Sequence, residues 1–377
     1  MLTLPEYPWE QLAPYRARAA EHPDGVADLS IGTPVDPTPE LIQHALREST
    51  DAHGYPTTAG TSQLREAIAS WYVRRRGAQI TPAQVIPSIG SKEFIAWLPL
   101  LMGLGPGDAV VRPEVAYPTY DIGAQLVGAT PVAADSLSEL DTDTRSRVKL
   151  VWTNSPANPT GRVDTADQVR EKIAEARAIG AVLAGDECYA ELGWDQWEPG
   201  VPSVLDPAVN GGDTTGLLSV YSLSKQSNLA GYRAAFAAGD EQIITTLINS
   251  RKHAGMIVPA PIQSAMVAAL NDDAHVQEQK DRYRIRRGQL LAALTESGLH
   301  VDHSEAGLYL WTRTVASAGR AATAEDTWNL VQRFADAGIV VGPGVFYGEA
   351  GNGYVRVAIT ATDDAVAQAV SRIRRGI

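Results

Sequence analysis

Cysteine, long hydrophobic runs and a basic start are scarce or missing in this sequence of 377 residues. Its one cysteine cannot form an intrachain disulfide, which fits a reducing compartment. The first residues lack the basic and apolar regions of a signal peptide. The most apolar stretch, 94–104, is interrupted by Pro99 and Gly103 and is too short to cross a bilayer. We therefore expect a soluble, cytoplasmic protein with no membrane partner.

An excess of basic residues and the common nucleotide and metal motifs are absent as well. The 32 basic and 44 acidic residues give a net charge of −12, which argues against a sequence-independent nucleic-acid binder. No Gly-Lys-Ser/Thr phosphate loop occurs, and the glycine-rich segment 103–107 precedes an expected strand instead of opening a helix. The single cysteine and seven scattered histidines form no metal-ligand spacing. We expect no nucleic-acid partner and no metal, whereas an anionic small-molecule substrate is compatible with these absences.

Helical and strand patterns alternate along most of the chain. Apolar residues at helical spacing predict an amphipathic helix over 62–76 with Thr61 as its N-cap. Short apolar runs without polar alternation indicate strands that are buried on both faces of a mostly parallel sheet. These runs lie at 85–89, 109–112, 148–153, 181–185 and 217–221. The sequence therefore predicts an α/β fold in which helices, such as one over 164–180, cross between parallel strands.

The last third changes character and predicts a smaller α+β lobe. Two helices are expected over 259–298, the second charged between Gln277 and Arg287 and exposed to solvent. The elements expected after them are a strand at 307–312, a helix at 325–337, a strand at 354–360 and a helix at 363–375. The expected divisions are an N-terminal segment 1–40 that joins the small lobe, a large domain 41–260 and a C-terminal small domain 261–377.

The segment 222–233, Ser-Leu-Ser-Lys-Gln-Ser-Asn-Leu-Ala-Gly-Tyr-Arg, is the most informative of the chain. Lys225 stands at the carboxyl end of an expected central strand, where open α/β sheets place ligands. Burial and cationic neighbours would lower the pKa of its amine and make it a nucleophile toward an aldehyde. Ser222, Ser224 and Arg233 offer hydroxyls and a guanidinium fork that suit a phosphate dianion. The segment predicts a Schiff base with pyridoxal 5′-phosphate (PLP), the alternative being a surface lysine in a polar turn.

Two further strand ends carry side chains that fit the same cofactor. Asn158, in the proline-set loop 154–161, is placed to donate to a phenolate oxygen, unless this loop is a plain turn. Asp186 ends a buried strand, where an unpaired carboxylate needs a cation such as a protonated pyridine nitrogen; the alternative is an N-cap. Tyr189, three residues on, is within reach of the phenolic oxygen of the ring.

Three more positions are candidates on the same grounds. Gly90, Ser91 and Lys92 open an expected helix, whose first N–H groups bind phosphate unless the helix is simply capped. Tyr117 offers a ring that can stack on a planar cofactor. Arg356 lies within an apolar strand and needs a carboxylate, either of a substrate or of a structural ion pair.

Taken in order from Gly32-Thr33-Pro34 to Arg356, these motifs resemble the fold-type I, class I and II aminotransferases, and the resemblance covers nearly the whole chain. It implies an enzyme that uses PLP, with a large domain built on a mostly parallel sheet flanked by helices and a smaller α+β domain. It also implies that Lys225 forms the Schiff base and is the base for the 1,3-proton shift, and that Asp186 pairs with the pyridine nitrogen.

The resemblance implies roles for the other candidates too. Tyr189 and Asn158 would contact the phenolic oxygen and Tyr117 would stack on the ring. The phosphate would be bound by Ser91, Ser222, Ser224, Arg233 and the backbone from Gly90 to Lys92. Arg356 would hold the substrate α-carboxylate, with Gly32 and Asn158 nearby. Tyr55 resembles a tyrosine that reaches the phosphate of the neighbouring subunit, which implies an obligate homodimer.

Two segments of the sequence resemble one subgroup of this family. The segments 32–39 and 224–233 are similar to N-succinyldiaminopimelate aminotransferases, and Asn228 stands where many relatives carry glycine. The implied reaction joins glutamate/2-oxoglutarate with N-succinyl-2-amino-6-oxopimelate, in diaminopimelate and lysine biosynthesis. Another amino-acid aminotransferase or a PLP-dependent C–S lyase remains an alternative. A ligand-sensing regulator domain of the same fold is a further one, although only 31 residues precede Gly32, too few for a winged helix.

Overall fold

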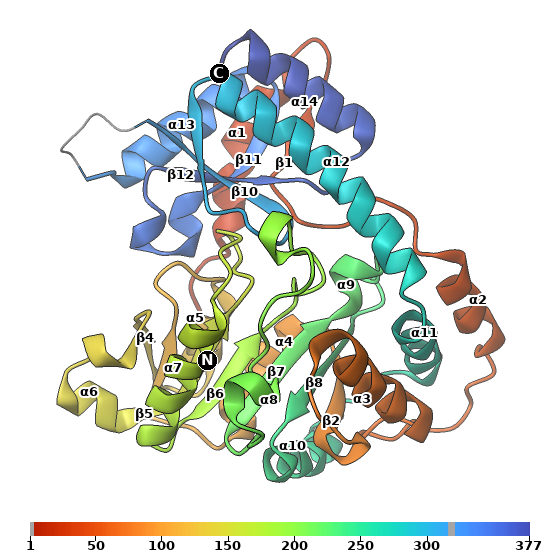
Figure 1. Ribbon diagram of the computed structural model, residues 1–377. Coiled ribbons are helices and arrows are strands. Elements are labelled where there is room, and N and C mark those ends of the chain that lie inside the picture. The colour runs from red at the N-terminus through yellow and green to blue at the C-terminus, as the bar shows by residue number, and fades with distance from the viewer. Residues whose placement is uncertain (1–3, 316–320) are drawn as a thin grey trace.

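The computed structural model describes residues 4–315 and 321–377, arranged as a large and a small lobe around two separate sheets (Figure 1). The mixed α/β architecture that the sequence predicts is confirmed. Residues 1–3 of the expected N-terminal segment and 316–320 of the expected small domain lie outside the described residues. Within the described ranges, no helix is long and apolar enough to cross a membrane.

The large lobe is built on a seven-stranded, mostly parallel sheet. In spatial order its strands are β2 (Val85–Ile89), β8 (Ala234–Gly239), β7 (Leu217–Ser222), β6 (Val182–Asp186), β5 (Val148–Asn154), β3 (Ala109–Arg112) and β4 (Thr130–Ala133). Of these seven strands, β8 alone runs against its neighbours. The carboxyl ends of the other six therefore lie at the same edge as the start of β8.

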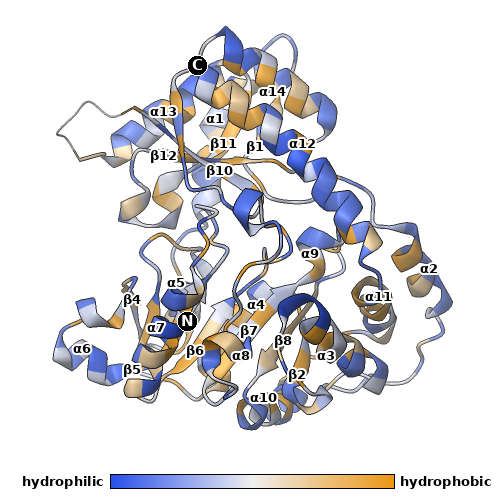
Figure 2. Cartoon of the chain, in the orientation of Figure 1, coloured by the Kyte–Doolittle hydropathy of each residue, from blue (hydrophilic) through white to orange (hydrophobic). Residues whose placement is uncertain are grey.

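Helices cover both faces of this sheet, and its central strands are hydrophobic in Figure 2 because they are buried, whereas the edge strand β4 is partly exposed. The helices of the large lobe are α2 (Glu40–Glu48), α3 (Ser62–Arg76), α4 (Ser91–Leu101), α5 (Thr119–Leu126), α6 (Thr142–Arg147), α7 (Ala166–Ala178), α8 (Pro207–Asn210), α9 (Leu223–Gln226), α10 (Glu241–Ala254) and α11 (Ala260–Leu270). Short 3-10 turns lie at η2 (Pro82–Gln84), η3 (Leu137–Glu139) and η4 (Asp195–Trp197).

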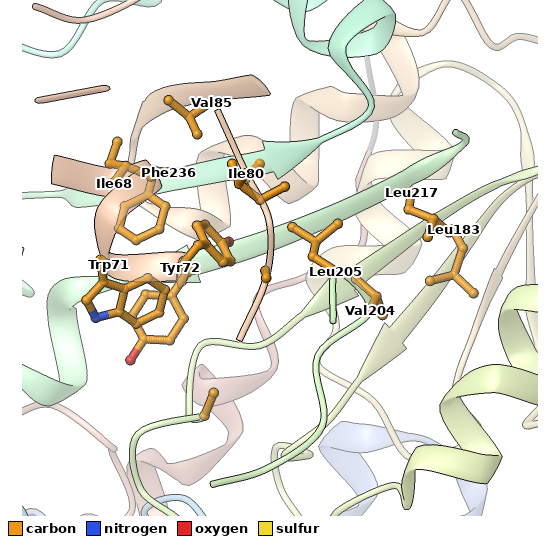
Figure 3. Packing of buried hydrophobic residues seen from close by; sticks show 14 of the residues in the cluster. Ile68, Trp71, Tyr72, Ile80, Val85, Leu183, Val204, Leu205, Leu217 and Phe236 are labelled. Atoms are coloured by element: carbon orange, nitrogen blue, oxygen red, sulfur yellow. The ribbon is translucent and has the colours of Figure 1, made fainter. Parts of the chain in front are cut away.

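The helix predicted over 62–76 is present as α3, and its aromatic residues anchor the core on one face of the sheet. Thr61 caps it by accepting the N–H of Leu64 at 3.2 Å. Trp71 and Tyr72 point from α3 toward Phe236 of β8 (Figure 3), with ring centroids 5.5 and 5.8 Å from that of Phe236. This packing holds β8 in place, and β8 begins directly after Arg233.

The small lobe contains a five-stranded sheet that includes part of the N-terminal segment. Its strands, in spatial order, are β1 (Ala27–Leu29), β11 (Ile339–Pro343), β12 (Tyr354–Ala358), β10 (Tyr309–Thr314) and β9 (Leu299–Asp302). Its helices are α1 (Ala13–Ala20), α12 (Ala274–Glu296), α13 (Ala324–Asp336) and α14 (Asp363–Arg375), with 3-10 turns η1 (Pro8–Leu12), η5 (Gly344–Tyr347) and η6 (Glu349–Gly351). The domain boundaries at residues 40 and 260 stay predictions; α11 packs against α2 and α3.

The expectation that the charged part of α12 is exposed to solvent is wrong for two of its charged residues. Figure 2 shows hydrophilic residues along the lower half of α12, where the helix leaves the small lobe and runs toward α9 and α11. Lys280 is 7% exposed and pairs with Glu198 at 3.1 Å. Arg286 is 2% exposed, and its two terminal nitrogens each donate to Asp36 at 2.7 Å. Charge spacing alone does not distinguish a solvated face from one that pairs with another segment.

The Asp36–Arg286 pair gives a test of this packing. Asp36→Ala is expected to lower the free energy of unfolding by about 2 to 3 kcal/mol, because Arg286 would keep only its bond to Asp363. Asp363→Ala removes the other, largely exposed partner of the same arginine and should cost less than about 1 kcal/mol. Denaturant unfolding followed by tryptophan fluorescence compares the two variants. Equal losses of unfolding free energy would contradict the conclusion that Asp36 is the main partner of Arg286.

Candidate active site

Neighbouring strands of the large lobe end side by side and place polar residues at one edge of the sheet. The parallel strands β5, β6 and β7 end at Asn154, Asp186 and Ser222. The strand β2 ends at the same edge and leads through Gly90 into α4, whose first residue is Ser91. Open α/β sheets bind ligands at this edge, so the strand ends that the sequence singles out meet in one place.

A cavity of about 400 Å³ lies at this edge, between the two lobes. The predicted residues that line it are Gly32, Ser91, Lys92, Tyr117, Asn158, Asp186, Tyr189, Ser222, Ser224, Lys225, Arg233 and Arg356. Gly90 is not among the lining residues, but it lies against the side chain of Arg233, which is one of them. Tyr55 is fully exposed and is not among the lining residues.

One end of the cavity offers serine hydroxyls and an arginine without a carboxylate. The hydroxyl of Ser222 donates to that of Ser224 at 2.9 Å. Arg233 donates to a backbone carbonyl at 3.0 Å, and no carboxylate within 4–315 or 321–377 pairs with it. Gly90 is required here, because it has φ of +81° and a Cβ would lie 2.2 Å from Nη2 of Arg233. This end is chemically suited to an anion with several oxygens, such as phosphate.

Lys225 extends from the short helix α9 into the middle of the cavity. Its Nζ donates to the carbonyl oxygen of Gly32 at 2.5 Å, and no ion pair with a carboxylate forms in the described part of the chain. Burial, followed by the positive charges of Arg356 and Arg233, lowers the pKa of its amine, against the opposing effect of Tyr309. An amine of lowered pKa is more often neutral, and only the neutral form attacks an aldehyde or accepts a proton.

Asp186 is a buried carboxylate that no cation of the described residues neutralises. It is 7% exposed and accepts hydrogen bonds from the Tyr120 hydroxyl at 2.7 Å and the Cys188 backbone N–H at 3.2 Å. Burial raises the pKa of this carboxyl, although the two hydrogen bonds oppose the effect. A cationic ring nitrogen in the cavity would relieve the cost of an unpaired buried charge.

Arg356 is a buried cation on the small-lobe side of the cavity. It is 3% exposed and donates to Oδ1 of Asn158 at 2.9 Å and to the carbonyl oxygen of Ser30 at 2.7 Å. Its Nε has no hydrogen-bond partner, and no carboxylate among the described residues pairs with it. A guanidinium that is buried without a carboxylate is suited to bind one from a ligand.

Several lining residues were not predicted. Tyr7, Trp9 and Arg16 come from the N-terminal segment, and Tyr309 comes from β10. These four residues have no sequence pattern that marks them as part of the site, since they reach the cavity only through the pairing of distant strands. Tyr120 is not a lining residue, but its hydroxyl donates to Asp186; the segment 117–120 pointed to its ring only as one that could stack on a cofactor.

The match to a protein family agrees with this geometry. The family described as aminotransferase class I and II matches residues 24–373. The chain belongs to this family. Class I and II aminotransferases depend on PLP, so the predicted enzyme class and cofactor are confirmed.

Curated relatives and solved structures carry different substrate names. The 4-dedimethylamino-4-oxo-anhydrotetracycline transaminase OxyQ of Streptomyces rimosus is 53% identical over 373 residues, covering 99% of this chain and 100% of the relative. An LL-diaminopimelate aminotransferase of Aquifex aeolicus is 32% identical over 385 residues, covering 98% of this chain and 96% of the relative. The solved structure of a "probable N-succinyldiaminopimelate aminotransferase" from Thermus thermophilus has a TM-score of 0.84 and 29% identity, covering 98% of this chain and 100% of that chain.

The residues of this aminotransferase fit PLP at three points. The unpaired guanidinium of Arg233, beside Ser222 and Ser224, matches a phosphate group. The buried carboxylate of Asp186 matches a protonated pyridine nitrogen, and the amine of Lys225 matches the aldehyde. The missing side chain of Gly90 leaves the room that Arg233 occupies.

A glycine substitution tests the phosphate end. Gly90→Ala is expected to weaken PLP binding by about ten- to a hundredfold, because the new Cβ displaces Arg233 and the backbone at φ of +81° is strained. Equilibrium dialysis of PLP against the PLP-free protein measures the dissociation constant of PLP. Gly105→Ala, in open space after α4, is the control and should bind PLP like the wild type. Unchanged binding in Gly90→Ala would contradict the assignment.

Proposed function

We propose that the protein catalyses PLP-dependent transamination between glutamate/2-oxoglutarate and N-succinyl-2-amino-6-oxopimelate, which forms N-succinyl-LL-diaminopimelate for diaminopimelate and lysine biosynthesis. The observation that carries the proposal is the buried Arg356, which has no carboxylate partner among the described residues and faces the same cavity as Lys225. Both substrates carry the α-carboxylate that such a guanidinium binds. The similarity to the diaminopimelate and N-succinyldiaminopimelate enzymes supports the choice of acceptor.

Two further cations line the cavity, and Lys92, the one without a carboxylate partner among the described residues, suits a substrate with several carboxylates. Nζ of Lys92 lies 5.3 Å from the ring centroid of Tyr7 and 5.8 Å from that of Tyr117, and no carboxylate in the described part of the chain pairs with it. Arg16 donates to Asp28 at 2.5 Å and to Ser30 at 2.8 Å, next to the carbonyl that Arg356 contacts. The site is therefore locally positive although the chain has a net charge of −12.

In this proposal each residue has the role that its surroundings allow. PLP, when bound, supplies an aldehyde that joins the substrate amine and a ring that accepts electrons from the Cα–H bond. Lys225 would hold the cofactor covalently through its Nζ, and the same amine would serve as the base that moves the proton of the substrate Cα–H bond. Asp186 would pair with the ring nitrogen, and Arg356 would orient the α-carboxylate with Gly32 and Asn158 nearby.

The remaining cofactor contacts are part of the same proposal. Tyr189 and Asn158 would contact the phenolic oxygen, and Tyr117 would stack on the ring. The phosphate would be bound by Ser91, Ser222, Ser224, Arg233 and the backbone from Gly90 to Lys92.

We also propose a cytoplasmic homodimer with shared active sites. Tyr55 lies outside the cavity of its own chain and is fully exposed in the loop before α3. An exposed tyrosine in this place is available to a second copy of the chain, in which it would reach the phosphate. The single, unpaired Cys188 fits a reducing compartment.

A second candidate function rests on the relative from Streptomyces rimosus. Its 53% identity is higher than that of the diaminopimelate aminotransferase from Aquifex aeolicus, and its name gives a ring ketone of a tetracycline precursor as the amino acceptor. In this candidate the glutamate half of the reaction is the same and only the acceptor differs. The two candidates are therefore separated by the second substrate alone.

The absorbance spectrum of the PLP-loaded protein tests both halves of the proposed reaction, the step with glutamate and the step with the amino acceptor. L-glutamate is expected to bleach the visible band of bound PLP, and 2-oxoglutarate should restore it. N-succinyl-2-amino-6-oxopimelate should restore the band as well; restoration by a 4-oxo-anhydrotetracycline alone would favour the second candidate. A band that ignores glutamate would contradict the proposal and direct attention to C–S lyase chemistry.

Substitution of the lysine tests its role. Lys225→Ala is expected to lower turnover by about 10²- to 10⁴-fold, because the base at the substrate Cα is lost. Lys252→Ala, an exposed lysine on α10, is the matched control and should keep wild-type turnover. Coupled assay of 2-oxoglutarate release measures both variants. Full turnover by Lys225→Ala would remove the assignment.

A further inference from the structure

Tyr309 lies where several parts of the site meet, and neither the sequence motifs nor the proposed roles use it. It is the first residue of β10, is 5% exposed and lines the cavity. Its ring contacts Arg356, its hydroxyl contacts that of Tyr189, and both neighbours have proposed roles toward substrate or cofactor. The two contacts are made by different parts of the same side chain, so they can be removed separately.

The ring of Tyr309 supports the guanidinium of Arg356. The central guanidinium carbon lies 4.0 Å from the ring centroid, closer than to the ring of Tyr347 at 5.2 Å or Trp9 at 6.0 Å. The strands β10 and β12 are antiparallel neighbours, and Trp311 is the register partner of Arg356. Tyr309 is therefore on the same face of the sheet, one diagonal step away. A desolvated cation–π contact of this kind fixes the arginine without neutralising it.

The hydroxyl of Tyr309 supports Tyr189. The two hydroxyl oxygens lie 3.2 Å apart, and the ring centroids lie 5.8 Å apart at 68°. The backbone makes room for this hydroxyl, because a Cβ on Gly32 would lie 2.0 Å from it. The carbonyl of the same glycine accepts from Lys225. The hydroxyl pair thus lies against the backbone segment that holds the lysine.

The hydrogen bond between the two hydroxyls can run in either direction. Burial raises the pKa of Tyr189 well above its ordinary value, and Tyr309 and Cys188 add to this while Arg356 opposes it. Burial acts on Tyr309 too, but the positive charges of Arg356 and Lys225 outweigh it and lower the pKa of Tyr309. When Tyr309 is the donor, the proton of Tyr189 is free to point into the cavity.

We propose that Tyr309 is a positioning residue of this aminotransferase: its ring holds Arg356 toward the substrate carboxylate, and its hydroxyl directs the Tyr189 hydroxyl toward the phenolic oxygen of PLP. The proposal rests on the proposed roles of Arg356 and Tyr189. It makes one side chain responsible for the relative placement of the substrate carboxylate and the cofactor oxygen.

A pair of variants separates the two contacts. Tyr309→Phe keeps the ring and removes the hydroxyl, whereas Tyr309→Leu removes both. The first readout is a spectrophotometric pH titration of bound PLP without substrate. Tyr309→Phe is expected to raise the apparent pKa of the visible band by about half a pH unit or more, because a less polarised Tyr189 hydroxyl stabilises the unprotonated form less.

The second readout is the dissociation constant of glutarate, a dicarboxylate that lacks an amino group and cannot react. Tyr309→Phe should bind glutarate within about twofold of the wild type, and Tyr309→Leu about three- to tenfold more weakly, because the cation–π contact is lost. Tyr283→Phe removes a buried hydroxyl outside the cavity lining and should match the wild type in both readouts.

Each result bears on the proposal. A titration of Tyr309→Phe that overlays the wild type would overturn the role of the hydroxyl, and wild-type glutarate binding by Tyr309→Leu would overturn the role of the ring. Failure of the proposed function is recognised separately, because it appears in the wild-type protein as a band that glutamate does not bleach.

Discussion

Asp186 ends a strand of the central sheet as a buried carboxylate, and its described partners are the neutral donors Tyr120 and Cys188. Asp186 is the register partner of Asn154 on β5 and of Val220 on β7, and β7 leads into the short helix that carries Lys225. A buried charge without a counter-ion is unfavourable, so the fold tolerates it only where a ligand completes the site. Arg356 presents the complementary problem, a buried guanidinium that no carboxylate of the described residues pairs with, and the exposed Arg233 has no such partner there either. The cavity is therefore best understood as a set of charges that PLP and an amino-acid substrate complete.

The topology explains how residues so far apart in sequence reach this cavity. The reversed strand β8 brings Arg233 to the edge at which the parallel strands end, and Trp71 and Tyr72 hold β8 there. The small lobe adds Arg356 from β12, together with the N-terminal segment through β1. The buried pair between Asp36 and Arg286 connects the loop after Gly32 to the long helix α12. Both lobes thus contribute to one site, and a change in their separation would alter it.

The sequence predicts the strand-end residues well because buried parallel strands have a simple signature and their carboxyl ends share an edge. Asp186 ends such a strand and Lys225 closely follows another, whereas Arg233 precedes the reversed strand β8, which the sequence did not predict. The three-residue strand β1 and the roles of Arg16 and Tyr309 were beyond prediction, because they depend on which strands pair in the small lobe. Lys280 and Arg286 were assigned to solvent because a charged helical face looks the same whether water or a carboxylate covers it. The proposed role of Tyr55 requires a second copy of the chain, which a single chain does not contain.

The most direct test of this account is the free energy of unfolding of wild type and Asp186→Asn, each with and without PLP. Burial raises the pKa of Asp186, so ionisation of its carboxyl opposes folding as the pH rises. Asparagine lacks this cost, and its amide can accept the Cys188 N–H on Oδ1 and donate from Nδ2 to the Tyr120 oxygen. Without PLP, the variant is expected to be at least as stable as the wild type at neutral pH. With PLP, the wild type should gain more stability, because only its carboxylate pairs with the ring nitrogen. A variant that is less stable without PLP and gains as much from PLP as the wild type would contradict the account.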